Sequence, residues 1–466
     1  MTRVSKNIFS LAISEGGSRL IGFVTTVYLV RSLSMHDFGL ISIAIAVFGY
    51  ALLFAVHWFN TYGIRQVASG TNNDFIGNYI SLRFILSVLI FIIVSILSVI
   101  IVTDYRLSTL IIYFTISIVP SALFLDWYFQ GKEDLVPVSI SKLIISAVYL
   151  LLLLLLLNHN SIMVVPLSFL FANVAGLILI FGWFISKYGY IKLSISISCW
   201  KEIIKESFAV SFASTLAQLN VNLPLLVVGV ILTASDVAIF NVSSKLVFVL
   251  LIADRLLYSI YFPAITRIYS QNQNRISEIL NFVLRWLILM ILPLSLFCIV
   301  AAEPLINLVF GIQYTNSIII FQVLIGYFLI TMMNSVLGYT LVAIKQEKYF
   351  ARTIYFGAVA NIILVLLLTY YFGLLGTAIA IVAAELLILI AFKLYLKKFV
   401  EIDIIIYIFK EMPALAAMGL TIYYTITYNV ALSFIAGLLI YSVLIYLFKC
   451  INKSDIGKIK ELLLWK

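Results

Sequence analysis

The chain has 466 residues, of which 64% are hydrophobic and 11% charged, and its mean hydropathy is +1.15. This balance excludes an ordinary water-soluble enzyme or binding module. A net charge of +10 would suit nucleic-acid binding only if the cations gathered on one soluble face, and no soluble domain fits between the apolar segments.

Apolar runs recur along the whole chain, each long enough to cross a hydrocarbon core of roughly 30 Å. We therefore predict an all-α polytopic membrane protein with about fourteen transmembrane helices. The expected spans are residues 8–32, 38–60, 80–102, 108–129, 138–157, 162–186, 206–232, 236–263, 282–302, 317–343, 350–371, 374–396, 410–428 and 430–449. Short breaks at Phe372-Gly373, residues 158–160 and Tyr428-Asn429 indicate turns between antiparallel helices.

The basic residues predict the topology. With the N-terminus in the cytoplasm, most of the 30 Lys and Arg residues fall in cytoplasmic segments, including Arg65 and Arg83. Both termini are therefore expected in the cytoplasm, in a bacterial plasma (inner) membrane. Because Glu15 and Arg19 interrupt the first apolar run, we interpret that run as an uncleaved span.

The two halves of the chain resemble each other. Ser34 to Ile41 and Thr233 to Phe240 share a pattern of Ser or Thr, then Asp, then a small residue and two apolar residues. Such a turn can arise locally as a helix cap, but the shared offset favours an internal duplication. We expect an N-terminal six-helix lobe (1–186), a cytoplasmic linker (187–205), a C-terminal six-helix lobe (206–398), and two additional helices with a basic tail (399–466).

Three cations lie inside predicted spans, namely Arg19, Lys245 and Arg255. A charge at that depth costs roughly 2.5–3.5 kcal/mol and usually faces a bundle interior or an aqueous cavity. These residues predict a positively charged cavity for an anionic substrate. Alternatives remain open: Arg19 could pair with Glu15 four residues earlier, and Lys245 could extend to the outer interface.

Other polar residues in the spans are candidates for ion coupling or substrate contact. Glu15, Asp254, Glu385 and Asp126 are intramembrane acids that can exchange a proton, and His57 titrates near neutral pH. His57 could equally be an interfacial residue, and Asp126 could serve a gate or a structural role. Asn220 and Asn222 make the seventh span polar, where they could contact sugar hydroxyls or hold helices together.

Nothing in the sequence indicates metal or catalytic chemistry. Cys199, Cys298 and Cys450 are far apart, and the three histidines form no catalytic constellation. We expect a protein that is not an enzyme and holds no metal or cofactor.

A signature segment, residues 126–133 (Asp-Trp-Tyr-Phe-Gln-Gly-Lys-Glu), resembles the (D/E)WxFQGxE motif of Wzx-type polysaccharide (O-antigen) repeat-unit flippases. Further stretches resemble the same family: Arg19-Leu20-Ile21-Gly22-Phe23, Leu33-Ser34, Asp37-Phe38-Gly39-Leu40, Tyr62-Gly63-Ile64-Arg65, Ala302-Glu303-Pro304-Leu305-Ile306, Phe310-Gly311 and Tyr314. The resemblance extends over nearly the whole chain.

The resemblance implies a function. The family shares a superfamily with multidrug exporters and the peptidoglycan-precursor flippase, all with two six-helix lobes around a central cavity. It implies movement of undecaprenyl-pyrophosphate-linked oligosaccharide repeat units, as for O-antigen in lipopolysaccharide biosynthesis, from the inner to the outer leaflet. Alternating access would be driven by a proton or sodium gradient. Expected partners are that glycan lipid, membrane lipids, and the polysaccharide polymerase and chain-length regulator, with no nucleic acid.

The resemblance also assigns residues. Family arginines on spans one, two and eight line the cavity; Arg19 and Arg255 match, whereas span two offers His57, so Lys245 would supply a third charge. Asp126, Gln130 and Arg65 fall in gate or structural motifs. The alternatives are a multidrug or metabolite antiporter of the same superfamily and a membrane enzyme of polysaccharide assembly. The residues name neither the sugar repeat nor the coupling ion.

Overall fold

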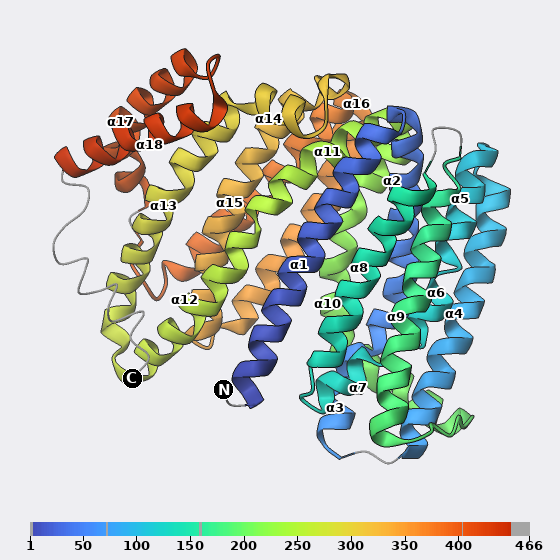
Figure 1. Ribbon diagram of the computed structural model, residues 1–466. Helices are drawn as coiled ribbons and strands as arrows, with labels where there is room; N and C mark the ends of the chain where they lie inside the picture. Colours follow the sequence, from blue (N-terminus) through green and yellow to red (C-terminus); the bar gives the residue numbers. More distant parts are fainter. Residues whose placement is uncertain (1–2, 71–72, 158–160, 403, 449–466) are drawn as a thin grey trace. The chain divides into compact units, whose positions relative to one another are not determined.

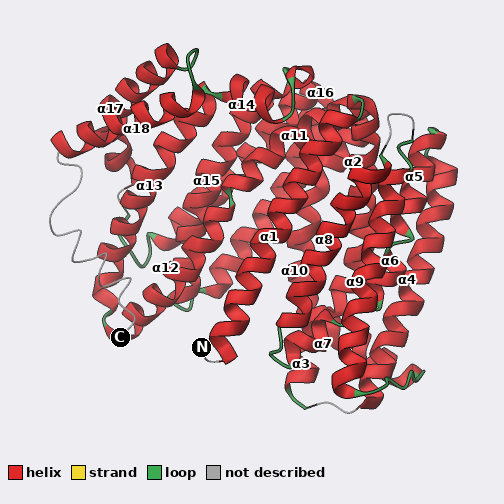
Figure 2. Ribbon diagram, viewed as in Figure 1, coloured by secondary structure: helices red, strands yellow, loops and turns green. Residues whose placement is uncertain are grey.

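The computed structural model describes residues 3–70, 73–157, 161–402 and 404–448. Every regular element in these ranges is a helix (Figure 2). The fold class is therefore all-α, as the apolar runs predict. The chain divides into two compact units, Met1–Ala238 and Ile239–Lys466.

The first unit begins with one long helix and continues with a series of longer and shorter ones (Figure 1). Its elements are α1 (Arg3–Ser32), α2 (Met35–Leu52), the π-helix η1 (Leu53–His57), α3 (Trp58–Ala68), α4 (Asn73–Ile101), α5 (Tyr105–Thr115), α6 (Ile118–Ala122), α7 (Asp126–Gly131), α8 (Val136–Leu156), α9 (Val164–Tyr188), α10 (Ile197–Ile231) and the start of α11 (Ala234–Leu250).

The second unit contains the rest of α11 and the C-terminal helices. These are α12 (Ile252–Gln271), η2 (Gln273–Arg275), α13 (Ile276–Val300), α14 (Ala302–Val309), η3 (Ile312–Tyr314), α15 (Ser317–Ala343), α16 (Glu347–Leu396), α17 (Ile404–Thr425) and α18 (Val430–Leu447). Helices α17 and α18 pack side by side (Figure 1), and their buried core includes Met418, Ile422 and Tyr441.

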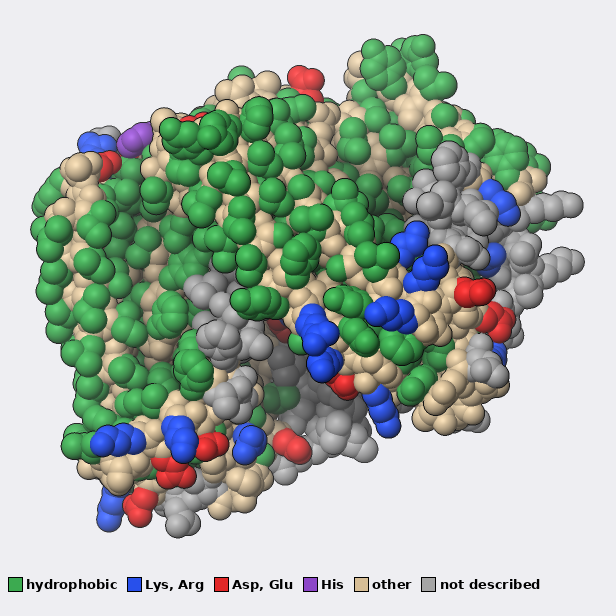
Figure 3. All heavy atoms as spheres, turned by 180° about the vertical axis from the view of Figure 1, so that it is seen from behind, with side chains coloured by type: hydrophobic (Ala, Val, Ile, Leu, Met, Phe, Trp, Pro, Cys, Tyr) green, Lys and Arg blue, Asp and Glu red, His purple; other side chains and the backbone are tan. Residues whose placement is uncertain are grey.

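Ten segments of the described chain are long and apolar enough to cross a membrane, judged by length and composition. Hydrophobic side chains cover most of the face shown in Figure 3. A multi-pass membrane protein follows from these features. The number fourteen and the cytoplasmic termini stay predictions.

The predicted turn at Phe372-Gly373 is confirmed. Gly373 adopts a φ of 60°, a conformation that favours glycine, and it divides α16 into two arms. The arms run back along each other, because the hydroxyls of Thr369 and Thr377 are 2.8 Å apart. The two arms correspond to the predicted spans 350–371 and 374–396.

Other predicted spans are less regular than expected. Residues 108–129 do not form one helix: α5, α6 and α7 are separated by non-helical residues 116–117 and 123–125. The span 236–263 consists of α11 and α12, which meet at Leu251. The span 38–60 contains the π-helix η1, a form that occurs mostly as a local bulge and often at functional sites.

The two repeated turns have the same capping geometry. The Ser34 hydroxyl accepts a hydrogen bond from the backbone N–H of Asp37 at 3.1 Å, and Thr233 does the same for Asp236 at 3.2 Å. The turns also meet, since a Cβ atom at Gly39 would overlap the backbone carbonyl of Ala234. Glycine at position 39 therefore permits this close approach.

The expected linker is fixed to α4. Residues 189–196 are non-helical, and within them the backbone N–H of Ser196 donates to Asn78 Oδ1 at 2.7 Å. The Ser81 hydroxyl donates to the carbonyl of Ser194 at 2.6 Å. In the chain, the boundary between the two compact units follows Ala238, and α10 therefore belongs to the first unit. Within that unit α10 packs against α2 and α3. The lobe boundaries expected at 187–205 stay a prediction.

Candidate functional site

Arg19 forms an ion pair on α1. Its Nη2 atom lies 3.1 Å from Glu15 Oε1, one helical turn earlier, and the two side chains are 42% and 43% exposed. The pairing alternative is therefore what the structure shows. Exposed pairs of this kind contribute little stability, about 0.3–0.5 kcal/mol, so Glu15 can be displaced by a stronger ligand at small cost.

Arg255 and Asp254 are adjacent on α12 but have different surroundings. Arg255 is exposed, whereas Asp254 is half-buried and accepts hydrogen bonds from the Tyr339 hydroxyl, 3.2 Å from each carboxylate oxygen. The rings of Tyr258 and Tyr339 pack edge to face at 4.9 Å. Packing against Tyr258 positions the Tyr339 ring, and with it the hydroxyl that donates to Asp254.

The other predicted substrate contacts lie on α10 and α11. Lys245 is half-buried, and within the described ranges its ammonium group has no hydrogen-bond or ion-pair partner. Asn222 is exposed, 3.5 Å from the position of a Cβ atom at Gly49. The side chain of Asn220 lies outside the described residues. Arg19 belongs to the first unit, and Lys245 and Arg255 belong to the second.

Glu385 is held by a residue that the sequence reasoning missed. The Asn334 side-chain amide, on α15, donates to Glu385 Oε2 at 2.6 Å and to the Glu385 backbone carbonyl at 3.0 Å. Asn334 is 6% exposed. Tyr327 interacts electrostatically with both Glu385 and Asp254. The two acids of the second unit are thus connected through α15. The sequence signal that could have identified Asn334 is a polar amide within the otherwise apolar 27-residue helix α15.

His57 ends the π-helix η1 and is exposed. Its Nδ1 atom lies 3.3 Å from the amide nitrogen of Asn60. It also interacts electrostatically with Asp126, Arg83 and Lys142. His57 is therefore near Asp126, the first residue of the signature segment, a proximity that was not expected from sequence.

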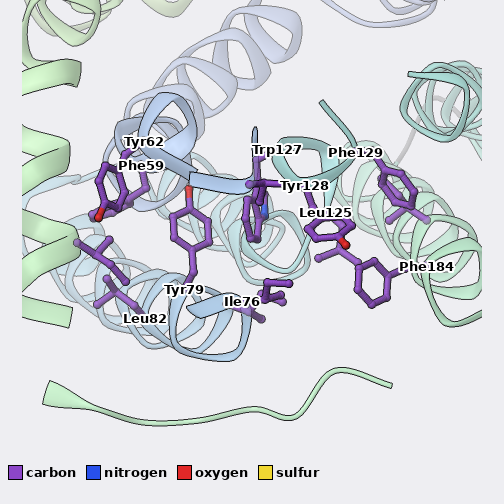
Figure 4. Close-up of a cluster of buried hydrophobic side chains, with 14 of the residues drawn as sticks. Phe59, Tyr62, Ile76, Tyr79, Leu82, Leu125, Trp127, Tyr128, Phe129 and Phe184 are labelled. Carbon is purple, nitrogen blue, oxygen red and sulfur yellow. The ribbon is translucent and has the colours of Figure 1, made fainter. Parts of the chain in front are cut away.

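The signature segment is mainly a packing element. Trp127 and Phe129 are 0% exposed, and the Trp127 ring lies 4.2 Å from the Tyr79 ring (Figure 4). Helix α7 lies close to α3, because a Cβ atom at Gly131 would be 2.6 Å from that of Val67. At Gly63 a Cβ atom would be 2.6 Å from the Tyr79 hydroxyl.

The polar members of these motifs are more accessible. Gln130 is half-buried and Arg65 is exposed on α3, so both can make further contacts. Asp126 is half-buried at the start of α7. The buried members of the motif form the scaffold, and Asp126, Gln130 and Arg65 lie at its margin.

Arg83 is not a free cytoplasmic charge, although the charge count placed it with the cytoplasmic segments. Its side chain is 0% exposed, and the guanidinium lies 5.5 Å from the centre of the Tyr79 ring. The charge count uses position along the chain alone and does not predict burial, so the cytoplasmic placement of Arg83 stays a prediction. Burial of a long cationic side chain depends on neighbouring helices.

Within the described ranges, no group of three His, Cys, Asp or Glu side chains is arranged to hold a metal ion. Cys199 and Cys298 are free thiols, and burial raises the pKa of the Cys199 thiol. Cys450 lies outside the described residues.

Comparison with known proteins identifies the family of this chain. A model of the family described as "Polysaccharide biosynthesis protein" matches residues 4–269, more than half of the chain. A putative O-antigen transporter of Escherichia coli K12 is 22% identical over 406 residues, covering 82% of this chain and 94% of that protein. A capsular polysaccharide biosynthesis protein, CapF of Staphylococcus aureus, is 25% identical over 405 residues, covering 84% and 99%.

Two solved structures have a similar fold. The inward closed lipid II flippase MurJ aligns with a TM-score of 0.74 at 15% identity, covering 94% of this chain and 98% of that one. An inward-facing MATE-family multidrug transporter of the MOP superfamily aligns with a TM-score of 0.65 at 14% identity, covering 84% and 97%. The sequence match and the all-helical membrane fold lead to one conclusion: this chain belongs to the polysaccharide biosynthesis protein family.

Proposed function

We propose that the protein is a flippase for undecaprenyl-pyrophosphate-linked oligosaccharide repeat units, moving them from the inner to the outer leaflet of the plasma membrane. The observation that carries the proposal is the fold similarity to a lipid II flippase over 94% of the chain, together with membership of a polysaccharide biosynthesis family. Another relative, of Haloferax volcanii, is named a probable low-salt glycan biosynthesis flippase, Agl15.

The cations provide the substrate chemistry of this proposal. A pyrophosphate group cannot cross hydrocarbon unaided, and the planar guanidinium of arginine binds phosphate oxygens in pairs. Arg19 and Arg255 are both exposed, so each can meet such a group. For Arg19, the pyrophosphate would replace Glu15, whose exposed ion pair is weak. Lys245, Asn220 and Asn222 would contribute further contacts to the pyrophosphate or the sugars.

The acids provide the coupling of this proposal. Glu385 and Asp254 are embedded in helices of the second unit, and each is held by a single neutral donor, Asn334 or Tyr339. Proton exchange at either acid would drive alternating access, and His57 is the third candidate. A sodium gradient is the other possible driving force.

A multidrug or metabolite antiporter is the second candidate, because a MATE-family transporter shares the fold. The three intramembrane cations favour an anionic substrate over the cationic drugs that such an exporter would carry. Both candidates place the protein in the plasma membrane with cytoplasmic termini, and the flippase would work beside a polysaccharide polymerase and a chain-length regulator.

The test is reconstitution in proteoliposomes with a defined undecaprenyl-pyrophosphate oligosaccharide, following its appearance in the outer leaflet. Hydrogen bonds to a charged group contribute about 1.5–3 kcal/mol, so Arg19→Ala and Arg255→Ala should each slow translocation about tenfold or more. Arg31→Ala is the matched control, since Arg31 is exposed at the end of the same helix as Arg19 and should retain wild-type flux.

Glu15→Gln separates the two roles of Arg19. If Arg19 binds the pyrophosphate, Glu15→Gln leaves flux intact or raises it, because the competing carboxylate is removed. A loss with Glu15→Gln equal to that with Arg19→Ala would show that the ion pair alone matters. Wild-type flux in both arginine variants would contradict the substrate assignment.

A further inference from the structure

The break in the fourth predicted span is supported by a buried arginine. Helix α6 ends at Ala122 and α7 begins at Asp126, so the intervening backbone lacks part of its helical hydrogen bonding. Irregular backbone within a membrane is tolerated only where other groups satisfy it. The carbonyl of Phe124 belongs to this non-helical backbone, and Arg83 Nη1 donates a hydrogen bond to it at 3.4 Å.

The opposite edge of the same guanidinium points to a ligand. Arg83 is 0% exposed, and its Nε and Nη2 atoms are buried without a hydrogen bond of good geometry; the Tyr79 hydroxyl, which interacts with the guanidinium, is likewise buried without one. These two nitrogens form the side-on fork with which arginine binds two acceptors at once. Asp126 Oδ1 is likewise buried without a hydrogen bond. Within the described ranges, no nitrogen–oxygen distance of 4.0 Å or less joins Arg83 to Asp126.

The groups around Arg83 and Asp126 connect the two residues. His57 interacts electrostatically with both, and Tyr79 does so as well, with its ring covering the guanidinium. Asn60, which contacts His57, has a buried side-chain oxygen without a hydrogen bond. Unsatisfied donors of Arg83 and unsatisfied acceptors of Asp126 and Asn60 therefore lie in one region of the first unit. The Tyr79 hydroxyl and Trp127 Nε1 of the same region also lack hydrogen bonds.

The balance of donors and acceptors selects the class of ligand. An anion would suit the Arg83 fork but would be repelled by the Asp126 carboxylate, and a metal cation would meet the opposite problem. Only a small ligand that both donates and accepts satisfies both sides, and buried water does this with about three hydrogen bonds each. A buried charge without a hydrogen-bond partner would otherwise be strongly destabilising.

We propose that Arg83 and Asp126 hold a small cluster of water molecules between them, open toward His57 and Asn60. Arg83 is then a positioning residue: it fixes the broken backbone directly through Phe124 and Asp126 through water. Asp126 keeps its place at the start of the signature segment without a direct ion pair. The water also joins the exposed His57 to the buried Oδ1 atom of the half-buried Asp126.

Hydroxyl-radical labelling of the purified full-length chain in detergent tests the proposal without any transport measurement. Radicals form from bound water, so Tyr79 should be labelled although it is 0% exposed. The protein is then mixed rapidly with H2¹⁸O before labelling. Tyr105, which is 82% exposed, should incorporate ¹⁸O at once because it meets the bulk solvent. Tyr79 should still incorporate ¹⁶O because its enclosed water has not yet exchanged. Tyr261, 2% exposed with its hydroxyl bonded to Thr340, is the control that should stay unlabelled.

Variants identify the groups that hold the water. Arg83→Leu should abolish Tyr79 labelling while Tyr105 labelling is unchanged. Replacing chloride with gluconate should change nothing, and a loss of labelling there would indicate an anion and overturn the water assignment. Absence of Tyr79 labelling in the wild type would overturn it as well.

A double-variant cycle covers the case in which Arg83→Leu does not fold. Arg83→Gln and Asp126→Asn each leave one buried charge without its partner, so each should lower the denaturant midpoint more than the double variant does. Additive losses would show that the two charges are independent and would overturn the water-mediated pair. Because these measurements need no substrate, a failed flippase assay leaves them unaffected.

Discussion

Gly131→Ala tests the close contact between α3 and α7. The added Cβ atom would lie 2.6 Å from Val67 Cβ and 2.9 Å from the Ile64 backbone oxygen. An ordinary carbon–carbon contact is about 3.5 Å, so the helices would have to separate by about 0.9 Å. Neither atom can rotate away, and Val67→Ala would not rescue the variant because its Cβ atom remains. Overpacking of this kind costs about 1–3 kcal/mol.

Gly182→Ala is the matched control on α9. No atom lies within 4 Å of its added Cβ atom, so it should gain up to about 1 kcal/mol from helix propensity. The two variants should then differ by about 1–4 kcal/mol, which is roughly a 5- to 800-fold difference in the unfolding equilibrium constant. Equilibrium unfolding in mixed detergent micelles measures this difference. Equal stability of the two variants would refute the packing argument.

Three further predictions concern hydrogen bonds. Asn334→Leu should destabilise the fold by about 1–3 kcal/mol, because Glu385 loses its donor, and Glu385→Gln in the same background should reduce that loss in the same unfolding assay. Tyr339→Phe should cost about 1 kcal/mol and shift the pH profile of flux if Asp254 is the coupling group; an unchanged profile would exclude that role. Thr233→Ala should cost about 1 kcal/mol through loss of the helix cap, and no loss would contradict the capping geometry.

The features that sequence predicts here are those set by local chemistry. Apolar length identifies the membrane segments, Gly373 permits the turn in α16, and Thr233 caps α11 through atoms three residues apart. Each depends on a few neighbouring residues, so one sequence suffices. The pairing of Arg19 with Glu15, left as an alternative, is equally local.

The features that sequence misses depend on contacts between distant segments. The breaks at residues 116–117 and 123–125 lie in a continuous apolar run, and packing against other helices decides where that run bends. The burial of Arg83 and the contact of Asn334 with Glu385 likewise involve residues 41 and 51 positions apart in the chain. Amino-acid composition does not show which distant residue a side chain contacts or toward which helix it points. The roles of Arg255, Lys245 and His57 in transport stay predictions.

The buried Arg83 has a consequence for how the protein is made. Its carboxylate counterpart, Asp126, is synthesised 43 residues later (126 − 83), and translation proceeds at about 5–20 residues per second. The nascent chain must therefore tolerate α4 with an uncompensated guanidinium for roughly 2–9 s. During that interval the long side chain can extend to the nearer membrane interface. The enclosed position of Arg83 against the Phe124 carbonyl becomes available only after the segment between α6 and α7 has been made.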